Sequence, residues 1–276
     1  PIYCINARLR DYVLHGNLLR RIYLRWAYKF FNHLYVQSEE DKNRFKLLGV
    51  EQEKLSVLGD VKSFNVAEKK RERSNVMLEY LEKELYITTL LVGSVHPGEL
   101  DVYLTLFANL KKTGHAVRMI LAPRHFHWKE ELVKKVKSAG FSFSMWDERG
   151  SEEFNSDILL VCRLGILFDL YQYANIFYLG GTFVTVGGHN LLEPAAFSLP
   201  MFIGPHHGNC KVTADALEQC GALKKIANVD ELCRVTTPLL GNAIERVRMG
   251  RRAGEWLDEE AKKVELVLDS IHVLRS

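Results

Sequence analysis

Apolar and polar positions follow two different periodicities along most of the chain. From about residue 87 onward, short runs rich in β-branched and aromatic residues alternate with longer stretches of helical periodicity. The predicted strands of this part lie within residues 86–94, 116–123, 141–145, 157–162, 176–181 and 201–205. Helices are predicted over 98–114 and 127–140, where Gly114 and Gly140 suit the left-handed residue that follows a helix. This alternation predicts βαβ units and a Rossmann-like, doubly wound parallel sheet of the α/β class.

The first 63 residues form a second group of predicted elements. A strand over 2–6 precedes a long basic and aromatic helix over 18–34, and a strand over 34–37 precedes a helix that Ser38 caps. These elements are typical of the tail of another α/β domain. The charged stretch 65–75 is predicted to be a linker or a first surface turn. We therefore expect two domains, residues 1–63 and residues 64–276.

Residues 180–209 place two glycine pairs, Gly180-Gly181 and Gly187-Gly188, on either side of an apolar stretch. Asn190 and a short amphipathic run follow, which predicts the start of a helix. Free N–H groups at a helix start, approached through residues that lack Cβ, bind anionic groups such as phosphate. Ligands of doubly wound sheets bind outside the carboxyl ends of the strands, where this stretch lies. It is therefore the first candidate for a binding site.

Composition and charge narrow the function further. The 276 residues are 47% hydrophobic, which is enough for one large or two smaller cores. A net charge of +3 is too small to indicate nucleic acid, and it leaves anionic small molecules or an anionic membrane surface open. Five cysteines without a C-x-x-C pair indicate neither a disulfide framework nor a zinc site, and they favour a reducing, cytoplasmic compartment.

The ends and the hydropathy of the chain carry two further expectations. No run of 18 apolar residues and no signal peptide occurs in the sequence. The chain starts at Pro1 with residues that are typical of the interior of a domain, so we expect it to be a fragment of a longer protein.

Two candidate contacts to an anionic ligand each have an ordinary structural alternative. Asn190 and Glu193 have the spacing of a capping box, which is the preferred interpretation from spacing alone, but Glu193 could also accept hydrogen bonds from a ribose diol. Arg124 follows a predicted strand and could hold a phosphate or carboxylate in a bidentate fork. A surface salt bridge is the equally weighted alternative for Arg124.

Histidines are frequent near the predicted strand ends. His125 and His127, like His206 and His207, lack a carboxylate or cysteine at metal-ligand spacing, so we interpret them as polar contacts and expect no metal. The segment 94–99 is another polar loop after a strand, in which Gly98 and Glu99 open a helix; simple capping is the favoured interpretation there.

The helix predicted over 18–34 has one basic face and one apolar face. Arg21, Arg25 and Lys29 are four residues apart, while Leu19, Ile22, Trp26 and Phe30 lie on another face. Two interpretations carry equal weight: a helix that lies in a membrane interface, or a helix that packs on the core with a solvated basic face.

Several motifs together resemble a known family, the 3-deoxy-D-manno-octulosonic acid (Kdo) transferases of lipopolysaccharide assembly. The matching segments are INARL (5–9), VQSEEDKNRFKLLG (36–49), LGDVK (58–62), APRH (122–125), GGTFVTVGGHNLLEPAAF (180–197) and GPH (204–206). The resemblance implies a GT-B glycosyltransferase that moves Kdo from CMP-Kdo to a lipid A precursor, lipid IVA. It also implies work at the cytoplasmic face of the bacterial inner membrane, on an anionic surface, with no cofactor, no metal and no nucleic acid.

The family pattern also implies the residues of the site. The residues implied for the CMP site are Pro123, Arg124, Leu164, Gly165, Ile166, Gly187, Gly188, Asn190, Leu191, Leu192 and Glu193. Further substrate contacts are expected from Arg8, Lys62, Ser94 and His96. Residues 1–63 would be a remnant of the acceptor-side domain, and residues 64–276 the complete C-terminal nucleotide-sugar-binding domain. The general base of the family is an acid early in the N-terminal domain, so we expect it upstream of Pro1.

Three positions depart from the family pattern. Ile166 stands where a glutamate is typical, Arg10 where a serine is typical, and Asp60 where an asparagine is usual. The first change removes a polar contact to the nucleotide, and the others concern the acceptor side. Two alternatives stay open: another GT-B transferase or nucleotide-sugar epimerase, which its nucleotide would distinguish, and a catalytically inactive nucleotide-binding or membrane-associating fragment.

Overall fold

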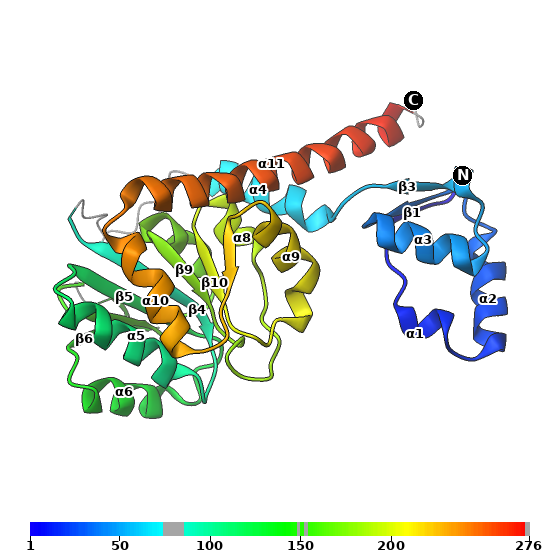
Figure 1. Cartoon of the computed structure of the whole chain (residues 1–276). Coiled ribbons are helices and arrows are strands. Elements are labelled where there is room, and N and C mark those ends of the chain that lie inside the picture. Colours follow the sequence, from blue (N-terminus) through cyan, green and yellow to red (C-terminus); the bar gives the residue numbers. More distant parts are fainter. Residues whose placement is uncertain (74–85, 148–149, 152–153, 274–276) are drawn as a thin grey trace. The chain divides into compact units, whose positions relative to one another are not determined.

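The computed structural model describes residues 1–73, 86–147, 150–151 and 154–273, which are α/β throughout (Figure 1). The chain divides into two compact units: Pro1–Lys69 together with Leu257–Ser276, and Lys70–Trp256. The domain limits expected from the sequence, at residues 63 and 64, stay a prediction.

A three-stranded parallel sheet of order β1-β2-β3 organises the first unit. Its strands are β1 (Tyr3–Ala7), β2 (His33–Val36) and β3 (Leu55–Val57), and its helical elements are α1 (Asp11–Leu14), α2 (Leu18–Tyr28), α3 (Glu39–Leu48), the 3-10 turn η1 (Gln52–Lys54) and the first part of α4 (Val61–Arg73). Leu34, Val36 and Phe45 are buried where α3 packs on the sheet. As predicted, Ser38 caps α3 by accepting the Asp41 N–H, at 3.1 Å.

Two predictions for this unit are wrong. The helix expected over 18–34 ends at Tyr28, because His33 and the residues after it form β2, which pairs with β1 on one side and β3 on the other. The stretch 65–75 is not a linker, since residues up to Arg73 belong to α4; residues 74–75 lie outside the described residues.

The second unit holds an eight-stranded sheet of order β11-β10-β9-β4-β5-β8-β6-β7. Every pairing is parallel except that of β7, which runs antiparallel to β6. The strands are β4 (Thr88–Val95), β5 (Val117–Pro123), β6 (Phe143–Asp147), β7 (Gly150–Ser151), β8 (Ile158–Val161), β9 (Ile176–Leu179), β10 (Met201–Ile203) and β11 (Leu223–Lys225). All residues of β5, β8 and β9 are buried, as expected for parallel strands with helices on both faces. This confirms the doubly wound parallel sheet.

Helices cover both faces of this sheet. They are α5 (Leu100–Lys112), α6 (Lys129–Ser138), α7 (Leu167–Leu170), the 3-10 turn η2 (Tyr171–Tyr173), α8 (Leu192–Ala196), the 3-10 turn η3 (Gly208–Cys210), α9 (Lys211–Gln219), α10 (Val229–Leu240) and α11 (Ala243–Val273). Alternate strand residues such as Leu90 and Tyr178 pack with α5, α6 and α10 in one core. Phe177, on the opposite face of β9, packs against Tyr171 of η2. Gly114 and Gly140 have the predicted positive φ, of 79° and 80°.

Candidate functional site

The candidate site of the second unit lies at the carboxyl ends of its central strands. The chain moves from β4 to β5 on one side of the sheet, whereas β9 and β10 lie on the other side of β4. The order of the strands therefore reverses at β4, which is where an open α/β sheet leaves a crevice for ligands. Loops 94–99, 123–128 and 180–191 follow these strands and meet at the reversal point.

The glycines after β9 let two loops approach each other closely. A Cβ on Gly180 would collide with the carbonyl group of Ser94, so glycine is required where the loop passes the end of β4. Gly188 has a φ of 73°, and its N–H donates to the Gly181 carbonyl at 3.0 Å. The loop thus folds back on itself before α8 begins, and it brings His189 over the end of β4.

The Glu99 side chain holds the loop after β9 in place. Its carboxylate is fully buried and accepts the N–H groups of His96 at 2.8 Å, Gly181 at 2.5 Å and Phe183 at 3.2 Å. Burial raises the pKa of Glu99, and these backbone donors oppose the shift because they favour the charged form. The Glu99 side chain makes no capping hydrogen bond to the start of α5, so the simple-capping interpretation is wrong. Instead, the side chain joins the loop after β4 to the loop after β9.

The imidazole rings of His96, His125 and His189 lie close to one another. The Nε2 atoms of His96 and His189 lie 3.1 Å apart, and the two rings are nearly parallel, with 21° between their planes. The ring of His125 stands edge-on to that of His96, at 5.8 Å between centroids. His96 is buried whereas His189 and His125 are exposed, so the cluster lines an open surface.

Arg124 completes a positively charged site. Its backbone N–H donates to the Val95 carbonyl at 2.9 Å, which holds the end of β5 against the end of β4. The positive charge of Arg124 contributes to lowering the pKa of both His96 and His189, after burial as the largest cause for each. The side chain is exposed, and among the described residues no acid lies within ion-pair distance of it. The structure therefore does not support the salt-bridge alternative, and Arg124 is available to an anionic ligand.

The segment after the glycines differs in detail from the predicted capping box. The Asn190 side chain caps the start of α8 through the Leu192 N–H, at 2.9 Å. Glu193 hydrogen-bonds the Tyr171 hydroxyl, and burial together with this carboxylate raises the pKa of Tyr171. Because α8 has five residues, its dipole is small. The N–H groups of Gly187 and Gly188 both donate to the Gly181 carbonyl, so they are not free to bind a phosphate.

The remaining predicted site residues fall into two sets. Pro123 ends β5, and the exposed residues Leu164 and Gly165 follow the neighbouring strand β8, with Ile166 directly before α7. Their strand ends therefore belong to the same edge of the sheet as Arg124. Ser94 lies beside Gly180 and has a strained φ of 59°.

Arg8 and Lys62 belong to the first unit and are both exposed. The Lys62 N–H donates to Asp60 Oδ1 at 3.0 Å, at the start of α4. An asparagine oxygen could accept the same bond, so the departure from the family pattern at Asp60 preserves this local structure.

Two residues of the site were missed or undervalued in the sequence. His189 follows the second glycine pair directly, and its position at a strand-end loop was the available signal. Glu99 has no sequence signature for its role, because two of the three backbone N–H groups that it binds are more than 80 residues away.

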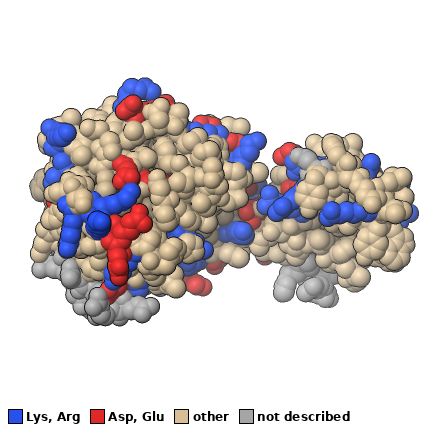
Figure 2. Space-filling view, turned by 90° about the horizontal axis from the view of Figure 1, so that it is seen from below, with Lys and Arg blue, Asp and Glu red and all other residues tan. Residues whose placement is uncertain are grey.

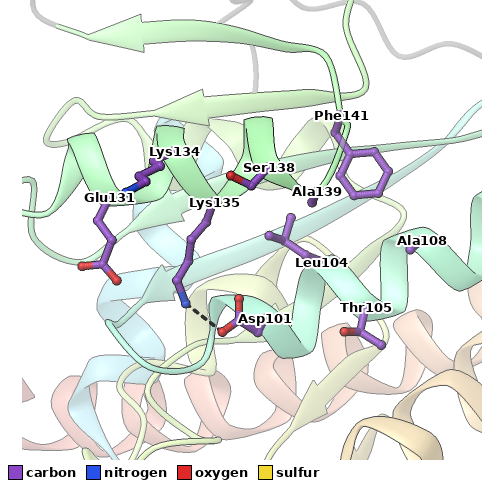
Figure 3. A pocket seen from close by; sticks show the side chains of 10 residues that line it. All are labelled: Asp101, Leu104, Thr105, Ala108, Glu131, Lys134, Lys135, Ser138, Ala139 and Phe141. Carbon is purple, nitrogen blue, oxygen red and sulfur yellow. Dashed lines mark hydrogen bonds and ion pairs between the residues drawn. The ribbon is translucent and has the colours of Figure 1, made fainter.

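A surface groove of about 550 Å³ lies away from these strand ends, between α5 and α6 (Figure 3). Leu104, Ala108 and Phe141 line it, and an ion pair of 2.7 Å joins Lys135 and Asp101 beside it. None of the predicted site residues lines this groove. In the described part of the chain, no three His, Cys, Asp or Glu side chains are arranged to hold a metal ion.

Comparison with known proteins gives consistent relatives. Residues 1–65 match the family described as 3-Deoxy-D-manno-octulosonic-acid transferase (kdotransferase). Over 240 residues the chain is 32% identical to the 3-deoxy-D-manno-octulosonic acid transferase of Aquifex aeolicus, a match that covers 87% of this chain and 60% of that protein. The chain thus spans little more than half the length of the curated relatives it matches.

Solved structures share the fold. The C-terminal CMP-Kdo binding domain of WaaA from Acinetobacter baumannii superposes with a TM-score of 0.57 and 18% identity, over 71% of this chain and 98% of that domain. UDP-GlcNAc 2-epimerase from Neisseria meningitidis gives a TM-score of 0.64 with 13% identity, over 100% of this chain and 70% of the epimerase. The fold alone is therefore common to transferases and epimerases, whereas the sequence relatives are Kdo transferases. The chain belongs to the 3-deoxy-D-manno-octulosonic acid (Kdo) transferase family.

Proposed function

We propose that this chain is the nucleotide-sugar-binding part of a glycosyltransferase that moves Kdo from CMP-Kdo to a lipid A precursor, lipid IVA, in lipopolysaccharide core biosynthesis. The observation that carries the proposal is the cluster of Arg124 and three histidines at the reversal point of the sheet, in a chain of this family. The Acinetobacter domain with the same fold is named for CMP-Kdo binding, which supports the same donor here.

The proposed reaction displaces CMP from the anomeric carbon of Kdo by a hydroxyl group of the acceptor. A base must remove the proton of that hydroxyl, and positive groups must stabilise the negative charge of the departing phosphate. Arg124 and the histidine cluster suit the second task. Glu193 is proposed to meet the ribose, while Arg8 and Lys62 are proposed to contact substrate from the first unit.

Replacing Arg124 with alanine is expected to weaken CMP binding by about 1.5 to 3 kcal/mol, or roughly 10- to 150-fold, because a charge-assisted hydrogen bond to phosphate is lost. Isothermal calorimetry measures the change. Arg248→Ala is the matched control, since Arg248 is exposed on α11 and pairs with Glu245 at 3.1 Å. An unchanged dissociation constant in Arg124→Ala would remove this residue from the proposed site.

We also propose that the protein works at the cytoplasmic face of the bacterial inner membrane, with α2 in contact with anionic lipid. No residue of α2 is buried, and Trp26 and Phe30 are 57% and 58% exposed, so the face that carries them does not pack on the core. Leu24 and Tyr28 pack on the core instead. Figure 2 shows mostly uncharged surface on the first unit, with Lys and Arg as the main charged groups. None of the described helices is both long and apolar enough to cross a membrane.

Vesicles test this contact. The chain is expected to co-sediment with vesicles that contain phosphatidylglycerol more than with pure phosphatidylcholine, and salt should weaken the binding. Trp26→Ser should reduce binding roughly tenfold or more, because the aromatic side chain no longer enters the interface. Leu47→Ser is the control, since Leu47 is 70% exposed on α3. Binding that does not depend on anionic lipid, on salt or on Trp26 would contradict a membrane contact through α2.

A further inference from the structure

His96 and His189 make a hydrogen bond to each other that limits how many protons they can hold. Their Nε2 atoms are 3.1 Å apart, which is a hydrogen-bond distance between two ring nitrogens. One Nε2 must donate and the other must accept, so a single proton lies between them. The donating ring keeps an unprotonated Nδ1, which can take one more proton and give the pair a positive charge.

A permanently charged arginine, a third histidine and one buried acid surround this pair. Arg124 and His125 approach from the loop after β5. Glu99 is the acid of the loop after β4, and both of its oxygens accept backbone N–H groups. The loop over residues 180–190 carries no titratable residue besides His189. No acid is among the groups that shift the pKa of His96 or of His189.

The same surroundings keep the empty pair neutral. Burial lowers the pKa of His96, and His189, His125 and Arg124 lower it further. Partial loss of solvent around the ring is the largest cause that lowers the pKa of His189, and Arg124 and His125 lower this pKa further. An anion beside the pair would act in the opposite direction, because a nearby negative charge favours the protonated imidazole. Proton uptake and anion binding are thus expected to favour each other.

We propose that His96 and His189 act as one anion-binding unit, which takes a proton from solvent when the nucleotide phosphate binds. This inference rests on the proposed cytidine-nucleotide site. The proton goes to Nδ1 of the donating ring, and the Nε2 proton stays shared. A second added proton would set two N–H groups face to face, so uptake does not exceed one proton per site.

Cytidine 5′-methyl phosphate is a suitable probe, because the phosphate of CMP itself takes up a proton at about pH 6 and a phosphodiester does not. Calorimetry at about pH 8 and about pH 5.5 is expected to give roughly tenfold tighter binding at the lower pH. Titrations near about pH 6.5 in buffers of different ionisation enthalpy should report uptake of up to one proton.

Glutamine variants separate titration from hydrogen bonding. The double variant His96→Gln/His189→Gln can still hydrogen-bond but has no imidazole left in the pair to take the proton, so its affinity should change less than about twofold between the two pH values. His115→Gln is the control, because His115 lies between α5 and β5, at the amino ends of the strands. This variant should keep the full pH dependence.

Wild-type affinity that does not change with pH, or full pH dependence in the double variant, would overturn the inference while leaving nucleotide binding in place. A chain that binds no cytidine nucleotide at either pH would reject the proposed function as well.

Discussion

Replacing Glu99 with alanine is expected to lower the free energy of unfolding of the second unit by about 3 to 5 kcal/mol. The substitution leaves the N–H groups of His96, Gly181 and Phe183 without the acceptor they now share. An unsatisfied buried donor costs about 1 to 3 kcal/mol, and water that enters the new cavity recovers part of the sum. Denaturant unfolding measures the loss.

Two further variants make the Glu99 experiment specific. Glu130→Ala, at an exposed acid on α6, should change the free energy of unfolding by less than about 0.5 kcal/mol. Glu99→Gln keeps one acceptor oxygen and should cost less than the alanine variant, because its amide nitrogen disturbs only part of the set. A Glu99→Ala variant within about 1 kcal/mol of wild type would show that the two loops are held by other contacts.

Transfer of Kdo is expected to fail with these 276 residues alone, although we expect them to bind CMP. A positioned general base contributes about 10²- to 10⁴-fold to the rate, and loss of acceptor orientation lowers the rate further. In the first unit, Asp41 accepts the Leu9 N–H at 3.0 Å and Asp60 accepts the Lys62 N–H. Glu40 pairs with Arg44, and Glu51 pairs with Lys54. These four acids are engaged in local structure, which supports our proposal that the base lies outside the 276 residues.

The assay supplies CMP-Kdo and lipid A precursor to this chain and to a version extended at its N-terminus to the length of the curated relatives. The extended protein should turn over at least about 10²-fold faster. Comparable rates would mean that the base lies within these residues and that the proposed division of labour is wrong.

Regular alternation made the second unit predictable. Strands such as β8 and β9 are continuous apolar runs between helical patterns, which is the signal of a parallel sheet covered on both faces. The three-residue strands β3 and β11 were not predicted, because so few positions show no periodicity.

The errors in the first unit have physical causes. Phe30 and Phe31 continue the helical pattern of α2 beyond Tyr28, but the chain must turn there so that β2 can enter between β1 and β3. In α4, Val66 and Ala67 are buried, and the charged run that follows them continues the helix with residues of high helix propensity. Charge alone therefore did not distinguish this helix from a linker.

The sequence predicts which ends of the strands form the site, but it does not predict which side chains contact each other there. Parallel strands bring their carboxyl ends together, so the proximity of the loops after β4, β5 and β9 follows from the fold class. The pairing of His96 with His189 joins residues 93 positions apart, and it depends on how the glycines fold the loop back. No local pattern contains that information.

The most direct test of the central claim is the affinity of this chain for CMP, UMP, AMP and GMP, measured by calorimetry under one set of conditions. Arg124 and the histidine cluster can serve any phosphate, so discrimination must come from the base. The proposed function predicts that CMP binds most tightly of the four. Tighter binding of UMP would favour an epimerase-like or other GT-B activity, and equal affinity for all four nucleotides would contradict a CMP-Kdo site.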